Sequence, residues 1–78
     1  MEIEGIFFSV CSSRLPRKEI CDSREIAMDR LDVNIKKARE AGGSAGMLDN
    51  GRWELHFPNQ LMILYWVEDS NGDVQRFP

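Results

Sequence analysis

The fold of this chain is decided by the apolar stretch Leu61-Met62-Ile63-Leu64-Tyr65-Trp66-Val67, which is closed by the polar turn at 68–73. An uninterrupted apolar run of this length, bounded by turn residues, predicts a β-strand. Because side chains alternate across a strand, the stretch has two apolar faces. One face carries Leu61, Ile63, Tyr65 and Val67, and the other carries Met62, Leu64 and Trp66. Both faces need cover from water.

Two further strands are predicted on either side of this stretch. Residues 52–57 alternate between an apolar set (Trp53, Leu55, Phe57) and a polar set (Arg52, Glu54, His56). Such alternation predicts a strand with one buried face. The turn pairs Pro58-Asn59 and Asn71-Gly72 then predict antiparallel hairpins that lead into residues 61–67 and on into a last strand at 74–77.

The first half of the chain predicts one strand and one helix. Residues 3–10 are rich in β-branched and aromatic side chains, which favours a first strand. Residues 11–20 lack periodicity and predict a connection, with room for a short helical turn at Pro16. Between the predicted helix and residue 51, the segment 44–50 is either a flexible connection or, if Asn50-Gly51 forms a tight turn, contains an extra strand at Met47-Leu48.

The helix is predicted from Asp22 to about Ala41. Asp22 is the expected N-cap, with Glu25 three residues later as in a capping box. Gly42 and Gly43 are expected to end the helix. Its apolar stripe has spacings of three and four residues and consists of Met28, Leu31, Ile35 and Ala38.

These elements predict a single small α+β domain over residues 1–78. The order is β-α-β-β-β, with one amphipathic helix packed on one face of a mostly antiparallel sheet. The chain has 78 residues, of which 42% are hydrophobic and 29% charged, so it has the composition of a folded protein with a small core.

Register arithmetic assigns the two faces of the predicted sheet. Two-residue loops would place Phe57 opposite Gln60 and Ser70 opposite Asp73. The face under the helix would then carry Trp53, Leu55, Phe57, Met62, Leu64, Trp66 and Phe77. The other face would be a partner-binding surface of Arg52, Glu54, His56, Leu61, Ile63, Tyr65, Val67, Val74 and Arg76. An apolar centre with a charged margin is typical of an interface.

Charge and hydropathy exclude several classes of protein. The formal net charge of -3 disfavours a nucleic-acid binder, because phosphate contacts require an excess of Lys and Arg. The longest apolar run is seven residues, whereas a membrane-spanning helix needs about 20. The acidic start Met1-Glu2-Ile3-Glu4 is unlike a signal peptide, so we expect a cytoplasmic protein. In that reducing compartment Cys11 and Cys21 are expected as free thiols.

No catalytic, metal or cofactor site is predicted. His56 shares a strand face with Arg52 and Glu54, a set that could perform acid-base chemistry but also arises from any solvated strand face. Cys11 and Cys21 are ten residues apart, without the closely spaced pair of a structural zinc site.

The segment from Gly51 to Val74, about a third of the chain, resembles the terminal sheet of ribosome-dependent toxin nucleases of the RelE and HigB type. This resemblance implies an RNA-acting protein that uses Arg52, His56 and Arg76. Toxins of that type are usually basic and have two helices after the first strand, whereas this chain is acidic and predicts one helix.

The sequence therefore favours a small non-enzymatic interaction or regulatory protein. One helix covers one face of the sheet, so we expect the second face to meet another copy of the chain or a larger protein partner. The RNA-acting protein is the alternative.

Overall fold

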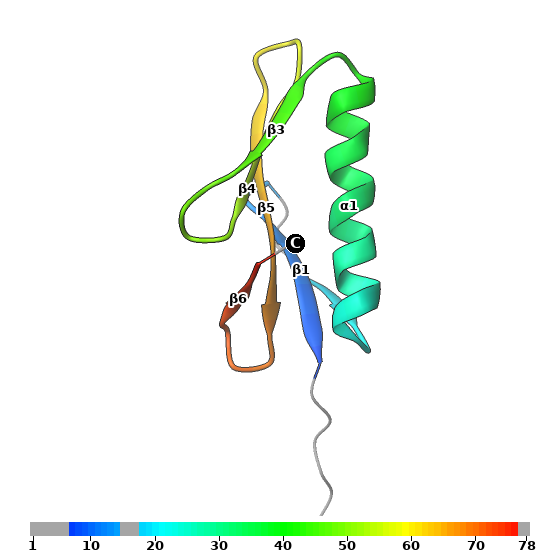
Figure 1. Cartoon of the computed structure of the whole chain (residues 1–78), viewed down its shortest axis with the longest axis vertical. Helices are drawn as coiled ribbons and strands as arrows, with labels where there is room; N and C mark the ends of the chain where they lie inside the picture. Colours follow the sequence, from blue (N-terminus) through cyan, green and yellow to red (C-terminus); the bar gives the residue numbers. More distant parts are fainter. Residues whose placement is uncertain (1–6, 15–17, 77–78) are drawn as a thin grey trace, which may run out of the picture.

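The computed structural model describes residues 7–14 and 18–76. These residues form β1 (Phe8–Ser12), β2 (Glu19–Cys21), α1 (Arg24–Glu40), β3 (Ser44–Met47), β4 (Trp53–His56), β5 (Met62–Asp69) and β6 (Val74–Gln75). Every strand pair among them is antiparallel, in the order β2-β1-β5-β4-β3. Strand β6 pairs with the part of β5 that follows the segment paired with β4. The predicted α+β architecture is confirmed, and Figure 1 shows α1 running beside the sheet on one side.

The N-terminal part differs from the prediction. The first strand begins at Phe8 and extends to Ser12; residues 1–6 lie outside the described residues, as does Pro16 with its predicted helical turn. Strand β2 begins near the end of the predicted connection at 11–20 and pairs with β1, with Phe8 opposite Cys21. Three residues are too few to show a period-two pattern, so this edge strand was not predicted.

The helix has well-defined caps at both ends. Ser23, not Asp22, is the N-cap, because its hydroxyl accepts a hydrogen bond from the Ile26 N–H at 3.1 Å. At the other end Gly42 has a φ of 91°, and the N–H groups of Gly42 and Gly43 donate to the carbonyls of Arg39 and Ala38. This pair of bonds is a Schellman motif, so the predicted glycine cap is confirmed.

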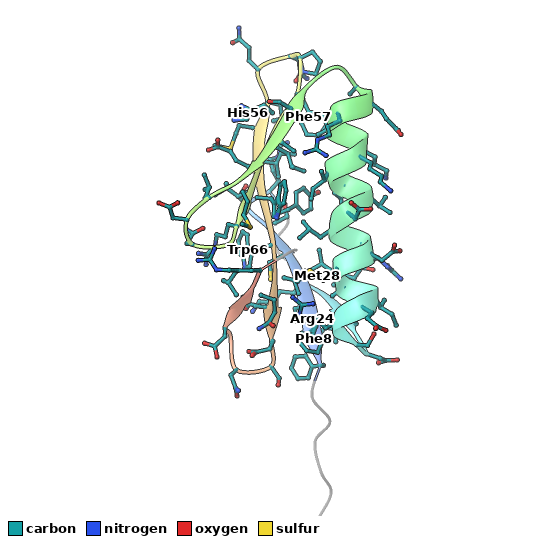
Figure 2. All side chains as sticks on the ribbon, in the orientation of Figure 1. Phe8, Arg24, Met28, His56, Phe57 and Trp66 are labelled. Atoms are coloured by element: carbon teal, nitrogen blue, oxygen red, sulfur yellow. The ribbon has the colours of Figure 1, made fainter. Side chains whose placement is uncertain are left out.

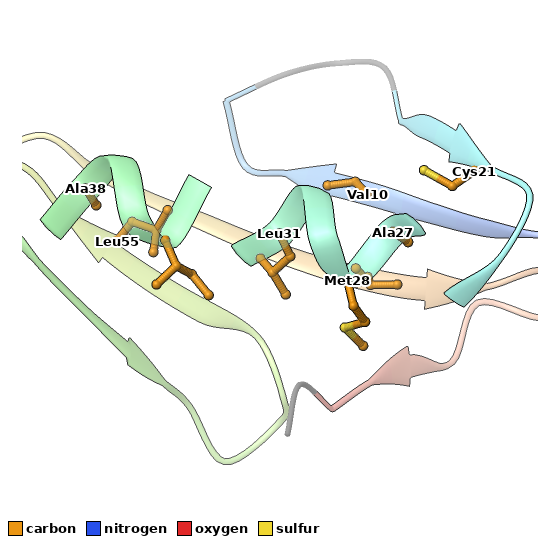
Figure 3. Packing of buried hydrophobic residues seen from close by; sticks show 9 residues of the cluster. Val10, Cys21, Ala27, Met28, Leu31, Ala38 and Leu55 are labelled. Atoms are coloured by element: carbon orange, nitrogen blue, oxygen red, sulfur yellow. The ribbon is translucent and has the colours of Figure 1, made fainter. Parts of the chain in front are cut away.

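The core lies between α1 and one face of the sheet. The predicted helix stripe is buried, together with Ala27. On the sheet side the buried apolar residues are Val10, Cys21, Leu55 and Val67. Figure 3 shows the side chains of this cluster filling the space between the helix and the strands. An extra strand before residue 51 is present as β3, but it spans Ser44–Met47 and overlaps the predicted Met47-Leu48 only at Met47; it packs on the core cluster through Ala45.

The predicted register is wrong by one residue. The Phe57 N–H donates to the Leu61 carbonyl at 2.9 Å, so the loop has three residues, 58–60, and ends at Gln60 with a φ of 69°. Trp53 therefore lies opposite Tyr65, and Leu55 opposite Ile63. A shift of one residue moves every side chain of a strand to the other face. As a result Tyr65 and Val67 face the helix, while Leu64 and Trp66 face away from it.

The register predicted for the last hairpin is also wrong by one residue. The Asp69 N–H donates to the Asp73 carbonyl at 3.0 Å, so this loop also has three residues and contains Gly72 with a φ of 90°. Val74 consequently lies opposite Glu68. Phe77, which was expected under the helix, lies outside the described residues.

Candidate interaction face

The sheet has one face that α1 does not cover, which we call the open face. Alternation along the paired strands places on it Ser9, Cys11, Ile20, Ser44, Gly46, Glu54, His56, Met62, Leu64, Trp66, Glu68 and Val74. Figure 2 shows Met28 and Phe57 between the sheet and the helix, and Trp66 on the far side of the sheet. Ile20 and Met62 are the most exposed large apolar residues of this face, at 63% and 44%.

A chain of contacts centres on Trp66. The Arg52 guanidinium lies over the indole ring, 4.7 Å from the ring centroid, in a cation-π contact. The indole N–H donates to a carboxylate oxygen of Glu68 at 3.3 Å. The other oxygen of Glu68 accepts a hydrogen bond from the Lys18 ammonium at 2.8 Å. Two side chains of β5, Trp66 and Glu68, are thus linked to Arg52 and Lys18 from two other parts of the chain.

Glu68 and Lys18, which form an ion pair in this cluster, shift each other's pKa. The hydrogen bond from Lys18 lowers the pKa of Glu68 below its ordinary value, against the opposing effect of burial. The same hydrogen bond raises the pKa of Lys18. Both groups are therefore charged at neutral pH.

Cys11 lies beneath this cluster, directly opposite Trp66 in the neighbouring strand. Burial raises the pKa of its thiol to about 11, and the nearby Glu68 carboxylate adds to the effect. Burial also raises the pKa of Cys21. Both thiols are free, as the sequence predicted, and both are buried in their protonated form at neutral pH.

A second polar pair lies farther along the open face. The His56 imidazole lies 3.0 Å from a carboxylate oxygen of Glu54. Arg52, the third member of the set considered for acid-base chemistry, stacks on Trp66 instead. The His56 side chain is 51% exposed, so the pair is a solvated surface contact. In the described part of the chain, no three His, Cys, Asp or Glu side chains are grouped to hold a metal ion.

The structure separates the residues that were predicted to form the partner-binding surface. Arg52, Glu54, His56 and Val74 lie on the open face. In contrast, Val67 is fully buried under the helix, Tyr65 packs against the core cluster, and Ile63 lies in the same row. The Leu61 carbonyl accepts the hydrogen bond that closes the 58–60 loop. By alternation, the Leu61 side chain is on the same side of the strand as Ile63. Arg76 donates to the Asp49 carbonyl and accepts from Arg24, at the end of β6.

Residues that the register prediction assigned to the core, Met62, Leu64 and Trp66, belong to the open face instead. Glu68 and Ile20 were not predicted as part of any site. The division of residues 61–67 into two faces was predicted correctly. Only the loop length at 58–60 decides which of them the helix covers.

The chain matches no protein-family model, no curated protein and no solved structure. The resemblance to toxins of the RelE and HigB type thus rests on the strand pattern alone. The described residues also contain no helix with the length and apolar character to cross a membrane.

Proposed function

We propose that this protein is a non-enzymatic interaction protein that binds the surface of another protein through its open face. The observation that supports the proposal is the Arg52–Trp66 stack at the centre of a sheet face that α1 leaves uncovered. Trp and Arg are the residue types that most often dominate the binding free energy of protein interfaces. Here the Arg52 contact and the Trp66–Glu68 hydrogen bond hold the indole in one orientation before any partner arrives.

The surroundings of Trp66 have the composition of an interface. Leu64 precedes it by two residues on the same face, and the exposed Met62 continues the apolar row. Polar pairs border this row: the ion pair of Lys18 with Glu68, and the contact of the His56 imidazole with the Glu54 carboxylate. An apolar and aromatic centre with a paired polar rim suits a protein surface.

The same face is a poorer match for RNA, the alternative function. The Glu54 and Glu68 carboxylates lie on the face where phosphates would have to approach. Arg52 occupies a face of the Trp66 ring on which a base would stack. Of the three residues named in the alternative, Arg76 is bound through its guanidinium to the Asp49 carbonyl. Binding of a short single-stranded RNA at low salt, weakening steeply as salt is added, would favour the alternative over the proposal.

The test compares substitutions at two apolar residues of similar exposure. Met62 on the open face is 44% exposed and Val33 on the outer surface of the helix is 42% exposed. Proteins captured from a native lysate by immobilised wild type are identified, purified and titrated against wild type, Met62→Lys, Val33→Lys and Trp66→Ala.

The proposal predicts that Met62→Lys weakens binding and that Val33→Lys leaves it unchanged. Trp66→Ala is expected to lower the affinity by about 30-fold, the effect of losing about 2 kcal/mol at an interface centre. If every purified partner binds all four proteins equally well, or if no captured protein binds the purified chain, the proposal is wrong.

A further inference from the structure

Strand β3 is an edge of the sheet with free backbone groups. Within residues 7–14 and 18–76 it pairs on one side with β4, and no strand pairs with its other side. The Leu48 N–H donates to the Arg52 carbonyl at 2.7 Å, so it is the even-numbered residues Ser44, Gly46 and Leu48 whose backbone groups point toward β4 and its extension. In an antiparallel pair alternate residues direct their N–H and C=O groups away from the partner. Ala45 and Met47 therefore direct theirs outward.

The two edges of the sheet differ in how they are protected. Strand β2 has three residues and includes Glu19, which forms an ion pair with Arg30 of the helix. Strand β3 has four residues, Ser44–Met47, with neither a charged residue nor a proline. Charge, proline and shortness are the usual means by which edge strands avoid pairing with other chains. By these criteria β3 is the edge open to pairing.

No contact or backbone angle in the described residues requires a glycine at Gly46 in β3. Its φ is not among the positive values that require glycine, and a Cβ at this position would meet nothing within 4 Å. Glycine inside a strand weakens it, and often marks a place where another backbone approaches. The neighbouring Gly43 is different, because a Cβ there would collide with the His56 carbonyl.

We propose that two copies of this chain pair through β3, antiparallel, about a two-fold axis at Gly46. In this register Ala45 of each copy lies opposite Met47 of the other. Both are hydrogen-bonded pairs, and each exchanges two backbone bonds, so the outward groups of Ala45 and Met47 are satisfied in both copies. The edge is thus complementary to itself.

The side chains fit the same register. The small side chain of Ala45 lies opposite Met47 of the second copy. The Met47 side chain, which is 42% exposed in the single chain, would become more buried in the dimer. A residue on a two-fold axis meets its own copy, so a charge there would be repelled. Gly46 has neither charge nor bulk. In the same register Asp49 lies opposite Gly43 of the second copy. The last helical turn next to that Gly43 has two cationic residues, Lys37 and Arg39, and one anionic residue, Glu40, so its net positive charge is complementary to the Asp49 carboxylate.

Pairing of this kind joins two sheets into one. The axis runs perpendicular to the sheet, so both helices lie on one side and both open faces on the other. The dimer would present two Trp66 clusters side by side on one surface. The pairing itself uses the edge of β3 and does not depend on what binds the open face.

Sedimentation velocity from micromolar to millimolar concentration tests the pairing, with lysine placed on the same face at each edge. Gly46→Lys puts two ammonium groups across the axis, whereas Ile20→Lys alters the β2 edge. Wild type and Ile20→Lys are expected to dimerise equally. Gly46→Lys is expected to associate at least about tenfold more weakly while remaining folded by circular dichroism, because a side chain at 46 has open space in the monomer.

A wild type that stays monomeric at millimolar concentration overturns the proposal. So does a Gly46→Lys variant that dimerises as wild type does. A dimer that is lost in Met62→Lys but kept in Gly46→Lys would assign self-association to the open face, and the edge would not be the interface.

A disulfide test covers the case in which Gly46→Lys fails to fold. Cys11 and Cys21 are buried, so Gly46→Cys introduces the reactive thiol of its chain, and the matched control is Ile20→Cys. The two-fold axis places the new thiols in a directly opposed pair, within the range of a disulfide. Gly46→Cys should oxidise to a covalent dimer at a dilution where Ile20→Cys stays monomeric. Equal rates for the two variants would contradict the pairing.

Discussion

The junction between helix and sheet at Gly43 allows a sharp prediction about stability. A Cβ added at Gly43 would lie 1.8 Å from the His56 carbonyl oxygen, whereas ordinary contact begins at 3.4 Å. Gly43→Ala therefore requires backbone to move by about 1.6 Å. The movement must separate β3 from β4 where Ser44 pairs with His56, or pull the Gly43 N–H away from the Ala38 carbonyl, which it bonds at 2.9 Å.

The cost follows from the contacts that must change. Overpacking costs about 1–3 kcal/mol, and each backbone hydrogen bond that is lost adds about 1 kcal/mol. With two bonds affected, Gly43→Ala should lower the free energy of unfolding by about 3–5 kcal/mol. A domain of this length has a total of roughly 4–12 kcal/mol. The melting temperature should therefore fall by about 12 °C or more.

The matched control is Gly46→Ala in the same strand. Its Cβ has open space, so alanine should stabilise the monomer by about 0.5–1 kcal/mol through better strand propensity. Both variants are measured by urea and thermal unfolding, with tryptophan fluorescence, at micromolar concentration where self-association is weakest. A Gly43→Ala protein within about 1 kcal/mol of wild type, or a Gly46→Ala protein less stable than Gly43→Ala, would refute the reasoning.

Three further predictions concern the core and the open face. Leu31→Ala, at a fully buried position, should cost about 2–5 kcal/mol in urea unfolding, while Val33→Ala at an exposed position of the same helix should cost less than about 0.5 kcal/mol. The stability that Glu68 gains from Lys18 is fully present above its ordinary pKa of 4.5 and is lost as the pH falls through the lowered folded value, so Glu68→Gln should destabilise at pH 7 and lose less than wild type on acidification. Cys11, with a pKa of about 11, should react with iodoacetamide at pH 8 far more slowly in the folded protein than in urea; equal rates would show that the thiol is accessible.

Local patterns in the sequence predicted most of the elements because their causes are local. The helix stripe, with spacings of three and four, is buried as expected, and Gly42 and Gly43 form the expected cap. The alternation at residues 52–57 and the apolar run at 61–67 both became strands. The N-cap prediction missed by one residue, because Asp22 and Ser23 are both good caps and only the backbone geometry selects one.

The pattern of residues 61–67 is enough to predict that β5 has two apolar faces and that one helix can cover only one of them. Which face is covered was decided by the tertiary structure, through a single residue. Gln60 in a left-handed conformation makes the 58–60 loop three residues long, and this places Val67 in the core and Trp66 on the open face. Pro58-Asn59 is compatible with either loop length. Only the packing of the helix stripe against Leu55 and Val67 favours one register over the other, because a one-residue slip would expose the whole buried row.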